Sequence, residues 1–425
     1  MGCCCLCFSG RQSVDMSEDL LDHQNVLVDV HISDSGPLVK IVRNSESMLA
    51  ISQIPEDCET KLTIALFGPQ ISGKSTFFKQ FCLMLNEFSD IEREAVALSI
   101  RYNIIESIQQ IVYFAIKKYN FLIDDEVSYL LKINKYDEKF SHQMINDIKS
   151  LWNNDVIQQS YKEIRILDIC DNLDYLMSVF DSDDLPSNET VIRNRIRTTG
   201  LREIKFYINN LDVTLLDIGG EKCEQKKWNR FNFDIGMFFV SLSDFDCLDD
   251  FIEFDNHNEI NINTNKNNIA DNNVNNSNTS NNNVGDDKIN NTYESENEKL
   301  RNSMNKKENL MIFMTFELFR KTLKEIFKEK LLLFVVFNKL DLFREKMKEN
   351  PNTFIDVFPE FTSKSTNSFK EDECLNYLQH KMEEIVQEEK IESLKVIFLP
   401  PTSCVDKELT ISLANTMVQH IIEIY

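Results

Sequence analysis

A glycine-rich pattern near residue 70 combines residue types that bind phosphate. Gly68 and Gly73 are separated by four residues and followed directly by Lys74 and Ser75. The glycines let backbone N–H groups converge on one anion, and the start of a following helix adds positive charge. A lysine at this place reaches the β- and γ-phosphates, and the serine hydroxyl can bind Mg²⁺. The pattern predicts a phosphate loop in a nucleotide site, made of Gly68, Pro69, Gln70, Ile71, Ser72, Gly73, Lys74, Ser75 and Thr76.

The stretches on either side of this loop have the composition of a strand and a helix. An apolar run, Leu62–Phe67, leads into the loop, and a helical stretch, Phe77–Leu85, follows it. A chance glycine turn beside a surface lysine would not be expected to lie between two such elements. We therefore interpret the loop as the connection between a strand and its helix in a nucleotide-binding fold.

A second motif indicates which base the nucleotide carries. Asn338, Lys339, Leu340 and Asp341 follow the apolar run Leu331–Phe337, which has the composition of a buried parallel strand. A carboxylate at 341 can accept hydrogen bonds from N1–H and the exocyclic amine of guanine, whereas adenine offers neither donor there. Asn338 would tie this loop to the base, and the stem of Lys339 would cover the ring plane. The sequence predicts a guanine nucleotide and disfavours an ATP-using phosphotransferase.

Two further stretches carry residues suited to the phosphate end of a nucleotide. The first, Ile192–Thr198, contains three arginines. In the second, Asp217 ends an apolar strand of a predicted hairpin and is followed by Gly219 and Gly220. A carboxylate at such a strand end belongs in the outer coordination sphere of Mg²⁺. The glycines provide a hinge and a backbone N–H that could donate to a γ-phosphate.

Together these motifs resemble those of heterotrimeric G-protein alpha subunits. The shared features are the phosphate loop, a helical insertion, Arg-Ile-Arg-Thr-Thr-Gly at 195–200, Asp-Ile-Gly-Gly at 217–220 and Lys-Lys-Trp at 226–228. The likeness covers roughly residues 60–420. It implies a P-loop GTPase fold of the α/β class, a doubly wound, mostly parallel sheet that carries an inserted all-helical domain. The implied GTPase domain spans residues 59–87 and 190–425, and the implied helical domain spans residues 88–189.

The resemblance also implies roles for individual residues. Thr198 matches the threonine that binds Mg²⁺ beside Ser75, and Arg195 matches the arginine that neutralises charge on the transferring phosphoryl group. The backbone N–H of Cys404 is expected to meet the base oxygen. The implied catalytic residues are Arg195 and Glu221, and the implied cofactors are GTP or GDP and Mg²⁺. The further nucleotide-binding residues are Ile192, Arg193, Asn194, Ile196, Arg197, Asp217, Ile218, Gly219, Gly220, Asn338, Lys339, Leu340 and Asp341.

Three positions depart from the family pattern where hydrolysis is catalysed. Glu221 stands where the family has a glutamine that orients the attacking water. A glutamine amide can donate to the γ-phosphate and accept from water, whereas a carboxylate can only accept and adds negative charge. Gln70 replaces a glycine and should crowd residue 221 and the water, and Ile71 replaces an acidic residue that pairs with the switch arginine. We therefore expect GTP to be hydrolysed at least about 100-fold more slowly than in an intact site.

The first residues predict attachment to a membrane by lipids. Gly2 is in place for N-myristoylation, and Cys3 heads a group of cysteines that are candidates for S-acylation, although Leu6 stands where the myristoylation pattern has Ser or Thr. One lipid chain binds a membrane marginally, whereas two hold a protein there. We expect residues 1–58 to form a lipidated segment at the cytoplasmic face of the plasma membrane. Cys4 and Cys7 form a lone C-x-x-C without a second half nearby, so no metal site is expected.

The composition argues against several other classes of protein. A net charge of −23 disfavours nucleic acid as a partner, because phosphate backbones attract clustered Lys and Arg. The same charge is repelled by an anionic membrane surface, so membrane residence needs an anchor. No apolar run reaches the ~18 residues of a spanning helix. The cysteines after position 7 are scattered singly, which is typical of reduced cytosolic thiols.

Two long segments are not expected to carry the chemistry of the site. Residues 88–189 lack glycine, and we expect a helical lid there with one apolar face formed by Ile104, Ile108, Ile111, Ala115 and Tyr119. Close to half of residues 256–292 are Asn, with few apolar residues, so we expect a disordered insertion within the GTPase domain.

The resemblance implies a G-protein βγ dimer and a G-protein-coupled receptor as partners, whereas the effector is not indicated. By the resemblance, residues 192–198 form the first switch and the stretch from Asp217 to Trp228 forms the second switch. The Lys226–Trp228 motif of the second switch is retained. The closing helix, Leu409–Ile424, stops several residues short of the family's receptor-recognition tail, and the N-terminal stretch lacks the charged helix that docks βγ. Two functions remain open. One is a signalling GTPase whose switches are ordered by GTP and released on hydrolysis. The other is a GTP-binding scaffold without useful turnover or receptor coupling.

Overall fold

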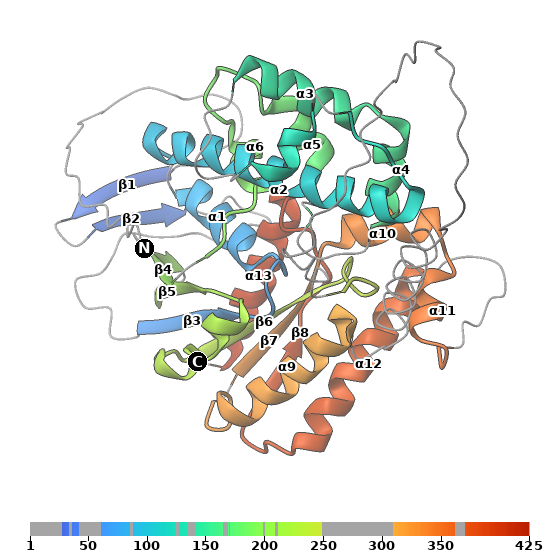
Figure 1. Ribbon diagram of the computed structural model, residues 1–425. Helices are drawn as coiled ribbons and strands as arrows, with labels where there is room; N and C mark the ends of the chain where they lie inside the picture. Colours follow the sequence, from blue (N-terminus) through green and yellow to red (C-terminus); the bar gives the residue numbers. More distant parts are fainter. Residues whose placement is uncertain are drawn as a thin grey trace, which may run out of the picture.

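The computed structural model describes residues 28–33, 36–41, 61–85, 88–124, 127–133, 141–164, 169, 171–198, 200–208, 211–248, 309–330, 332–361 and 370–424. Figure 1 shows a sheet with helices packed around it and a second group of helices above. Gly2, Cys3, the Asn-rich residues 256–292 and the predicted N-terminal segment apart from 28–33 and 36–41 lie outside the described residues.

A six-stranded sheet forms the centre of the larger layer, in the order β4-β5-β3-β6-β7-β8. β4 is antiparallel to β5, and all other neighbouring strands are parallel. Every residue of β6 and β7 is buried, as expected where helices cover both faces of parallel strands. The strands are β3 (Lys61–Phe67), β4 (Leu201–Ile208), β5 (Leu211–Ile218), β6 (Ile235–Ser241), β7 (Leu332–Asn338) and β8 (Lys395–Phe398).

Alternate residues of β3 face opposite sides of the sheet. Leu62, Ile64 and Leu66 pack with α1 (Lys74–Leu85) and α13 (Lys407–Ile424). Ala65 and Phe67 pack with helices on the other side, and each face of the sheet therefore has its own core. The predicted doubly wound, mostly parallel α/β fold is confirmed. The helices of the second face are α9 (Met311–Glu325), α10 (Leu340–Glu349), α11 (Thr353–Val357) and α12 (Glu371–Glu389).

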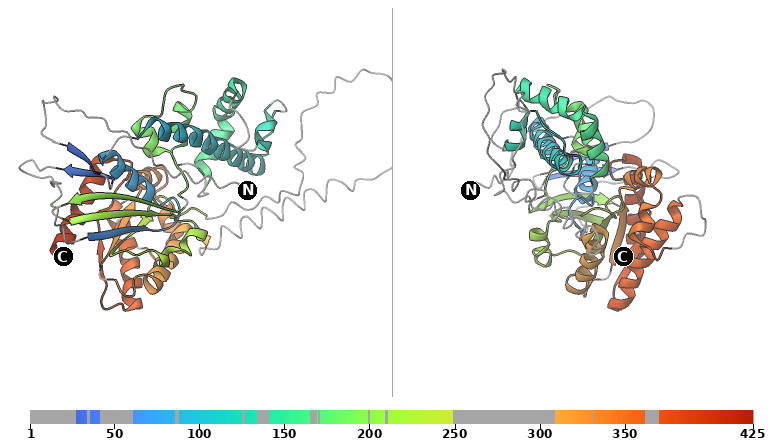
Figure 2. Two further views of the ribbon diagram at one scale, coloured as in Figure 1. Left: turned by 90° about the vertical axis from the view of Figure 1, so that its left-hand side faces the viewer. Right: turned by 45° about the vertical axis from the view of Figure 1, so that its right-hand side comes forward.

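The second layer is a helical insertion between α1 and β4, and Figure 2 shows it on one side of the sheet layer. Its longest helix is α2 (Asp90–Tyr119). α2 starts with a capping box between Ser89 and Glu92 and ends at Asn120, which has a left-handed backbone. Its predicted apolar face is buried except for Tyr119, which is 37% exposed. Tyr119 is the last residue of the helix, and its hydroxyl donates to the Glu163 carboxylate at the surface instead of entering the core.

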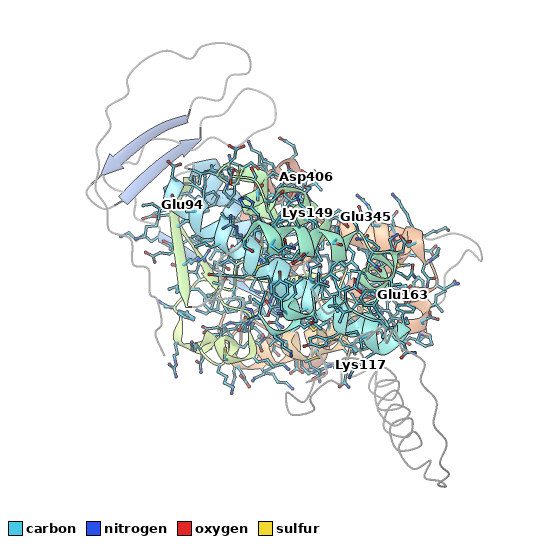
Figure 3. The ribbon with its side chains drawn as sticks, turned by 45° about the horizontal axis from the view of Figure 1, so that its top comes forward. Glu94, Lys117, Lys149, Glu163, Glu345 and Asp406 are labelled. Atoms are coloured by element: carbon cyan, nitrogen blue, oxygen red, sulfur yellow. The ribbon has the colours of Figure 1, made fainter. Side chains whose placement is uncertain are left out.

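The helical insertion has a core of its own, to which Ile104, Ile148 and Leu173 contribute. Charged side chains such as Lys149 and Glu163 lie on its outside (Figure 3). Although α2 has 30 residues, neither it nor any other described helix is long and apolar enough to cross a membrane. The other elements of the insertion are η1 (Ser128–Lys132), α3 (His142–Trp152), α4 (Asp155–Glu163), α5 (Leu173–Val179) and α6 (Asn188–Arg193).

A hairpin that the sequence patterns do not predict precedes the first core strand. β1 (Val28–Ser33) and β2 (Gly36–Ile41) pair antiparallel, and β2 lies beside β4. Two short elements, α7 (Lys222–Gln225) and η2 (Trp228–Arg230), follow β5 in the chain. The Trp228 side chain is buried, and its Nε1–H donates to the Gly219 carbonyl at 2.9 Å. This bond ties the Lys-Lys-Trp motif to the loop after β5.

The chain leaves and re-enters the sheet layer at one place around the Asn-rich insertion. Leu248 and Leu310 form a β-bridge, and the Met311 N–H donates to the Cys247 carbonyl at 2.8 Å. Because the two ends are adjacent, the length of the segment between them has little effect on the geometry of the sheet.

Candidate functional site

One cleft lies between the helical insertion and the loops that follow β3, β5, β7 and β8. Open α/β folds bind ligands at this edge of the sheet. The predicted residues that line the cleft are Gln70, Ile71, Gly73, Lys74, Ser75, Thr76, Ile192, Arg193, Asn194, Arg195, Ile196, Arg197, Thr198, Gly220, Glu221, Asn338, Lys339, Asp341 and Cys404. The other predicted residues, which belong to the same loops and strand ends without lining the cleft, are Gly68, Pro69, Ser72, Asp217, Ile218, Gly219 and Leu340.

The phosphate loop needs glycine at both of its spaced positions. Gly68 has φ +133° and Gly73 has φ +95°, which side-chain-bearing residues rarely adopt. A Cβ atom at 73 would lie 1.8 Å from Asn338 Nδ2, and one at 68 would lie 2.4 Å from the Phe239 carbonyl oxygen. Ile71 also has a positive φ, +60°, and a β-branched residue is strained in this region. The loop therefore keeps an unusual backbone shape against close neighbours.

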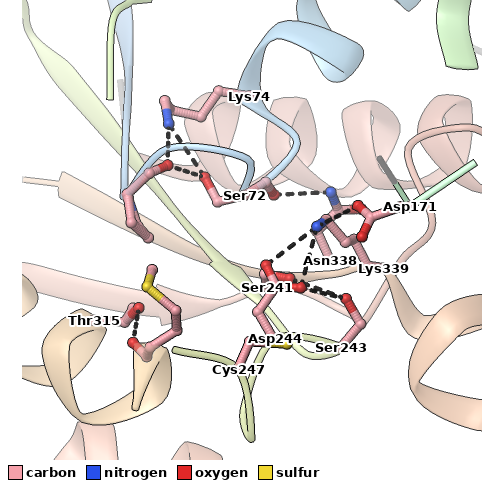
Figure 4. A network of polar contacts seen from close by, with 12 residues as sticks. Ser72, Lys74, Asp171, Ser241, Ser243, Asp244, Cys247, Thr315, Asn338 and Lys339 are labelled. Atoms are coloured by element: carbon pink, nitrogen blue, oxygen red, sulfur yellow. Dashed lines mark hydrogen bonds and ion pairs between the residues drawn. The ribbon is translucent and has the colours of Figure 1, made fainter. Parts of the chain in front are cut away.

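The Lys74 ammonium group lies inside the curl of this loop. Its Nζ donates to the carbonyls of Gly68 (2.9 Å) and Pro69 (2.6 Å) and to the Ser72 hydroxyl (3.2 Å). Figure 4 shows the bond between Lys74 and Ser72. Burial lowers the pKa of Lys74 to about 8, although the nearby Asp217 carboxylate opposes this shift. A negatively charged group at the loop would favour the charged form of this lysine.

We expect the affinity for magnesium-GTP to fall as the pH rises above about 8. In the ligand-free protein, burial puts the pKa of Lys74 near this pH, whereas phosphate oxygens would hold the bound lysine protonated. Binding then takes up a proton, and the affinity falls by up to about tenfold per pH unit. Calorimetric titrations between about pH 7 and pH 9 measure this slope. Lys74→Arg should remove the lysine's share of the slope, because a guanidinium keeps its proton. The same slope in both proteins would contradict the prediction.

Oxygen atoms suited to Mg²⁺ gather beside Lys74. The hydroxyls of Ser75 and Thr198 lie 2.6 Å apart, and the Thr198 hydroxyl donates to Asp217 Oδ2 at 3.4 Å. Asp217 is fully buried, its Oδ1 atom has no hydrogen-bond partner, and burial raises its pKa. A buried carboxylate oxygen of this kind fits a hydrated cation. In the described part of the chain, His, Cys, Asp and Glu form no cluster of three that could hold a metal.

Asn338 joins three loops of the site through its side chain. Its Nδ2 donates to the Ser72 carbonyl at 2.9 Å, and its Oδ1 accepts from the Cys404 N–H at 2.9 Å. The base motif is thus tied to the phosphate loop and to the loop after β8. The Cys404 N–H, which we expect to meet a base oxygen, donates to Asn338 in the structure. Burial raises the pKa of the Cys404 thiol, which stays neutral. Asp341 lies in the first turn of α10 and lines the cleft.

The helical insertion contributes residues to the cleft as well as covering it. Lys339 Nζ lies 2.6 Å from Oδ2 of Asp171, which precedes α5, and 3.1 Å from Oδ2 of Asp244, which follows β6. Burial disfavours the charged lysine, but these two carboxylates outweigh it and raise the pKa of Lys339. Ile169 and Asn172 also line the cleft. These three insertion residues could not be predicted from the sequence, because no local pattern connects them with the base motif.

Replacing Asp171 by Asn is expected to speed release of bound GDP about tenfold. The change removes an ion pair in which buried Lys339 of the base motif meets a partly exposed carboxylate of the helical insertion, while Asp244 still balances Lys339. A loss of about 1.4 kcal/mol corresponds to this factor. Chase of a fluorescent GDP measures the rate. Asp181→Asn is a matched control, since it removes an ion pair with Lys149 inside the insertion and should leave release unchanged. Equal rates for Asp171→Asn and the unaltered protein would show that the pair does not hold the two layers together.

Two of the three departures from the family pattern, Gln70 and Glu221, lie at the phosphate end of the cleft. Gln70 and Glu221 line the cleft together, and they also line a second cavity next to Met311 and Met314. The Glu221 carboxylate lies 3.7 Å from Arg197 Nε. The Arg195 side chain belongs to the cleft lining, and its backbone carbonyl accepts from Asn103 Nδ2 at 2.7 Å. The acidic group at 221 is therefore paired with a different arginine from the one expected to act in catalysis.

Lys79 is a site residue that sequence reasoning missed. It lies on α1 one helical turn after Ser75 and lines the cleft, and this four-residue spacing was the available signal. Its Nζ donates to the carbonyls of Val191 (3.0 Å) and Asn194 (2.8 Å). Burial lowers the pKa of Lys79 to about 8, with smaller contributions from neighbouring charges. Lys79 therefore fastens the start of residues 192–198 to the helix that begins at the phosphate loop.

Comparisons with known proteins agree with this geometry. The sequence pattern of the G-protein alpha subunit family matches residues 42–422. The chain is 28% identical to guanine nucleotide-binding protein subunit alpha-1 of Trichomonas vaginalis over 336 residues, which cover 76% of this chain and 69% of that protein. It is 23% identical to the alpha-9 subunit of Dictyostelium discoideum over 334 residues, which cover 76% and 80% of the two chains. It is 28% identical to the alpha-2 subunit of Neurospora crassa over 261 residues, which cover 57% and 66%. The chain therefore belongs to the G-protein alpha subunit family, a family of guanine nucleotide-binding signalling proteins.

Proposed function

We propose that this protein binds GTP and GDP with Mg²⁺ in the cleft and acts as a membrane-associated switch. The observation that carries the proposal is the pair of bonds made by Asn338, which joins the guanine-type motif to the phosphate loop and to Cys404. A base held by Asp341 and phosphates held by the loop around Lys74 would then belong to one ligand. Family membership supports the guanine nucleotide, and the loop geometry supports the placement of its phosphates.

The residues divide into binding groups by their positions in the cleft. Backbone N–H groups of the phosphate loop and the Lys74 ammonium would hold the phosphates, since both are suited to an oxyanion. Asp341 would accept from the guanine edge, and Cys404 would donate to its oxygen. Ser75 and Thr198 would bind Mg²⁺ directly, with Asp217 accepting from a metal-bound water. The bound ion neutralises charge on the phosphate oxygens.

Hydrolysis in this site would depend on Arg195, with a weak contribution from residue 221. Water would attack the γ-phosphorus, the bond to the β-γ bridging oxygen would break, and GDP and phosphate would leave. Arg195 would neutralise charge that develops on the phosphate oxygens. Glu221 offers no donor to those oxygens, and it already lies near Arg197. We therefore propose slow turnover.

The proposed location and partners follow from the family and from the N-terminal residues. Lipidation at Gly2 and Cys3 would hold the protein at the cytoplasmic face of the plasma membrane. A G-protein βγ dimer and a receptor are the partners to test first, because the family generally binds both. Lys226 and Lys227, which precede the buried Trp228, are retained in the second switch.

The first experiment is a loading assay. The purified protein is incubated with GTP and Mg²⁺, freed of unbound nucleotide, and its bound nucleotide is followed by chromatography. We expect bound GTP to persist and excess ATP not to displace it. Rapid appearance of GDP would mean that Gln70 and Glu221 are tolerated and that the switch turns over at an ordinary rate. Failure to retain either guanine nucleotide would overturn the proposed function itself.

A GTP-binding scaffold without useful turnover or receptor coupling is the second candidate. The 3.7 Å distance between the Glu221 carboxylate and Arg197 Nε favours the scaffold. This ion pair engages one residue of the first switch (192–198) and one residue of the second switch with each other. The two candidates differ in how fast they exchange bound nucleotide when partners are present. A scaffold would keep GTP over hours even when βγ and a receptor-rich membrane are added, whereas a slow switch would exchange its nucleotide under those conditions.

A further inference from the structure

One polar face of α2 runs along the segment that carries Arg195. Asn194 Nδ2 donates to the Ser99 hydroxyl at 2.5 Å. Asn103 Nδ2 donates to Asn194 Oδ1 at 2.9 Å and to the Arg195 carbonyl at 2.7 Å. One turn further on, Glu106 lies 4.0 Å from Arg197 Nη2. Ser99, Asn103 and Glu106 follow the four- and three-residue spacing of one helix face, so successive turns of α2 contact successive residues of the segment.

The opposite face of the same helix is buried in the core of the helical insertion. Ile100, Ile104 and Ile108 are at most 2% exposed. This packing sets the rotation of α2 about its axis and hence the direction of Asn103. The position of the polar face is therefore fixed by the insertion, whereas its hydrogen-bond partners belong to the segment that enters the cleft.

Residue 194 is held from the GTPase side as well. Its carbonyl accepts from Lys79 on α1, and its side chain is bound by α2. Asn194 is 2% exposed, and a buried amide that loses its partners is costly. The side-chain bonds join Asn194 to α2 and the bond to its carbonyl joins it to α1, which makes residue 194 a joint between the two layers. The residue that follows the joint is Arg195.

We propose that Asn103 is a positioning residue for GTP hydrolysis. By holding Asn194 and the Arg195 carbonyl together, it sets the point from which the Arg195 side chain extends to the transferring phosphate. The helical insertion then contributes to the chemical step as well as covering the nucleotide. This inference rests on the proposed function, in which Arg195 acts in catalysis.

Asn103→Asp tests the proposal, because it keeps the shape of the side chain and removes both donated hydrogen bonds. Gln109→Glu is the matched control on the same helix. Gln109 Nε2 also donates to two acceptors, the Leu130 and Ile133 carbonyls, and both lie inside the helical insertion. The two changes thus remove the same number of bonds and add the same charge. Only the first touches the segment that carries Arg195.

The main measurement is the rate at which preloaded GTP is hydrolysed in a single turnover. We expect Asn103→Asp to slow it roughly 10- to 100-fold, which is the range for a displaced catalytic group, and Gln109→Glu to leave it unchanged. In an Arg195→Ala background, Asn103→Asp should have no further effect. The same fold loss in both backgrounds, or equal losses for the two amide variants, would overturn the proposal.

A second measurement does not depend on hydrolysis. Amide hydrogen exchange should become faster across residues 192–198 in Asn103→Asp and across residues 128–133 in Gln109→Glu. Unchanged exchange at 192–198 would contradict the contact itself. Binding of a fluorescent GTP analogue is measured on every variant. If none of the proteins, including the unaltered one, binds it, the proposed function has failed, while the exchange result still decides whether α2 holds the segment.

Discussion

Replacing Glu221 by Gln and Gln70 by Gly together is expected to raise the rate of hydrolysis of bound GTP by at least about 100-fold. The glutamine amide would donate to a γ-phosphate oxygen while its carbonyl accepts from the attacking water, and a carboxylate can do only the second. The glycine would clear space, because residues 70 and 221 line the same cleft. The measurement is a single-turnover assay with chromatographic detection of GDP.

The two single variants and one background serve as controls for this result. Each single change should give only part of the gain in hydrolysis rate. Glu221→Gln alone leaves the bulky Gln70 side chain in the cleft, and Gln70→Gly alone leaves a carboxylate at 221. Adding Arg195→Ala to the double variant should remove most of the gain. The cost to stability should be small, because the Glu221–Arg197 pair is exposed enough to contribute little. A double variant no faster than the unaltered protein would rule out this explanation of slow turnover.

Replacing Asp341 by Asn is expected to lower the affinity for GDP by at least about 100-fold. Two hydrogen bonds to a charged carboxylate would be lost, each worth about 1.5–3 kcal/mol, and every 1.4 kcal/mol is a factor of ten. The amide would offer an N–H donor in place of an acceptor. Xanthine carries a carbonyl where guanine carries its amine, so XDP should bind the variant more tightly than GDP does. Competition against a fluorescent nucleotide measures both affinities.

Asp356→Asn is the control for this change of base preference. Asp356 is an exposed residue of α11 and does not line the cleft. Its replacement should leave the preference for GDP intact. If Asp341→Asn retained the order GDP before XDP with unchanged affinities, the base would not be read by residue 341, and the guanine assignment of the Asn338–Asp341 motif would be wrong.

Short motifs were sufficient to predict the fold class and the elements around the site. The apolar run before the phosphate loop became β3, the run before Asn338 became β7, and the predicted hairpin became β4 and β5. The predictions of β3 and β7 succeeded because burial on both faces of a parallel sheet requires continuous apolar strands. The long helix α2 was likewise predicted from the helical spacing of its apolar residues. Tyr119 was predicted to lie on the buried apolar face, but its side chain is partly exposed. It is the last residue of the helix, where the surroundings of the side chain and not the apolar period decide its burial.

Partners far apart in the chain could not be predicted in the same way. Ser72 and Asn338 are 266 positions apart, and nothing in either motif indicates the hydrogen bond between them. The ion pair of Lys339 with Asp171 was missed for the same reason. In the sequence, the polar face of α2 consists of the residues that lie between the periodic apolar ones. Its contact with Asn194 and Arg195 could not be predicted, because that contact depends on how the insertion packs on the sheet layer.

Residue types and their spacing were therefore enough to predict the chemistry of each loop, because phosphate and base recognition depend on residues within a few positions of one another. They also indicated the α/β class and the departures at Gln70, Ile71 and Glu221. Which of these groups lie close together could be read only from the folded chain. Packing places the Asn338 amide between two loops, leaves an unpaired oxygen of Asp217 beside the hydroxyls of Ser75 and Thr198, and turns one face of α2 toward the Arg195 backbone. Such contacts form between segments distant in the chain, so their geometry arises from the packing of the whole fold and not from local spacing.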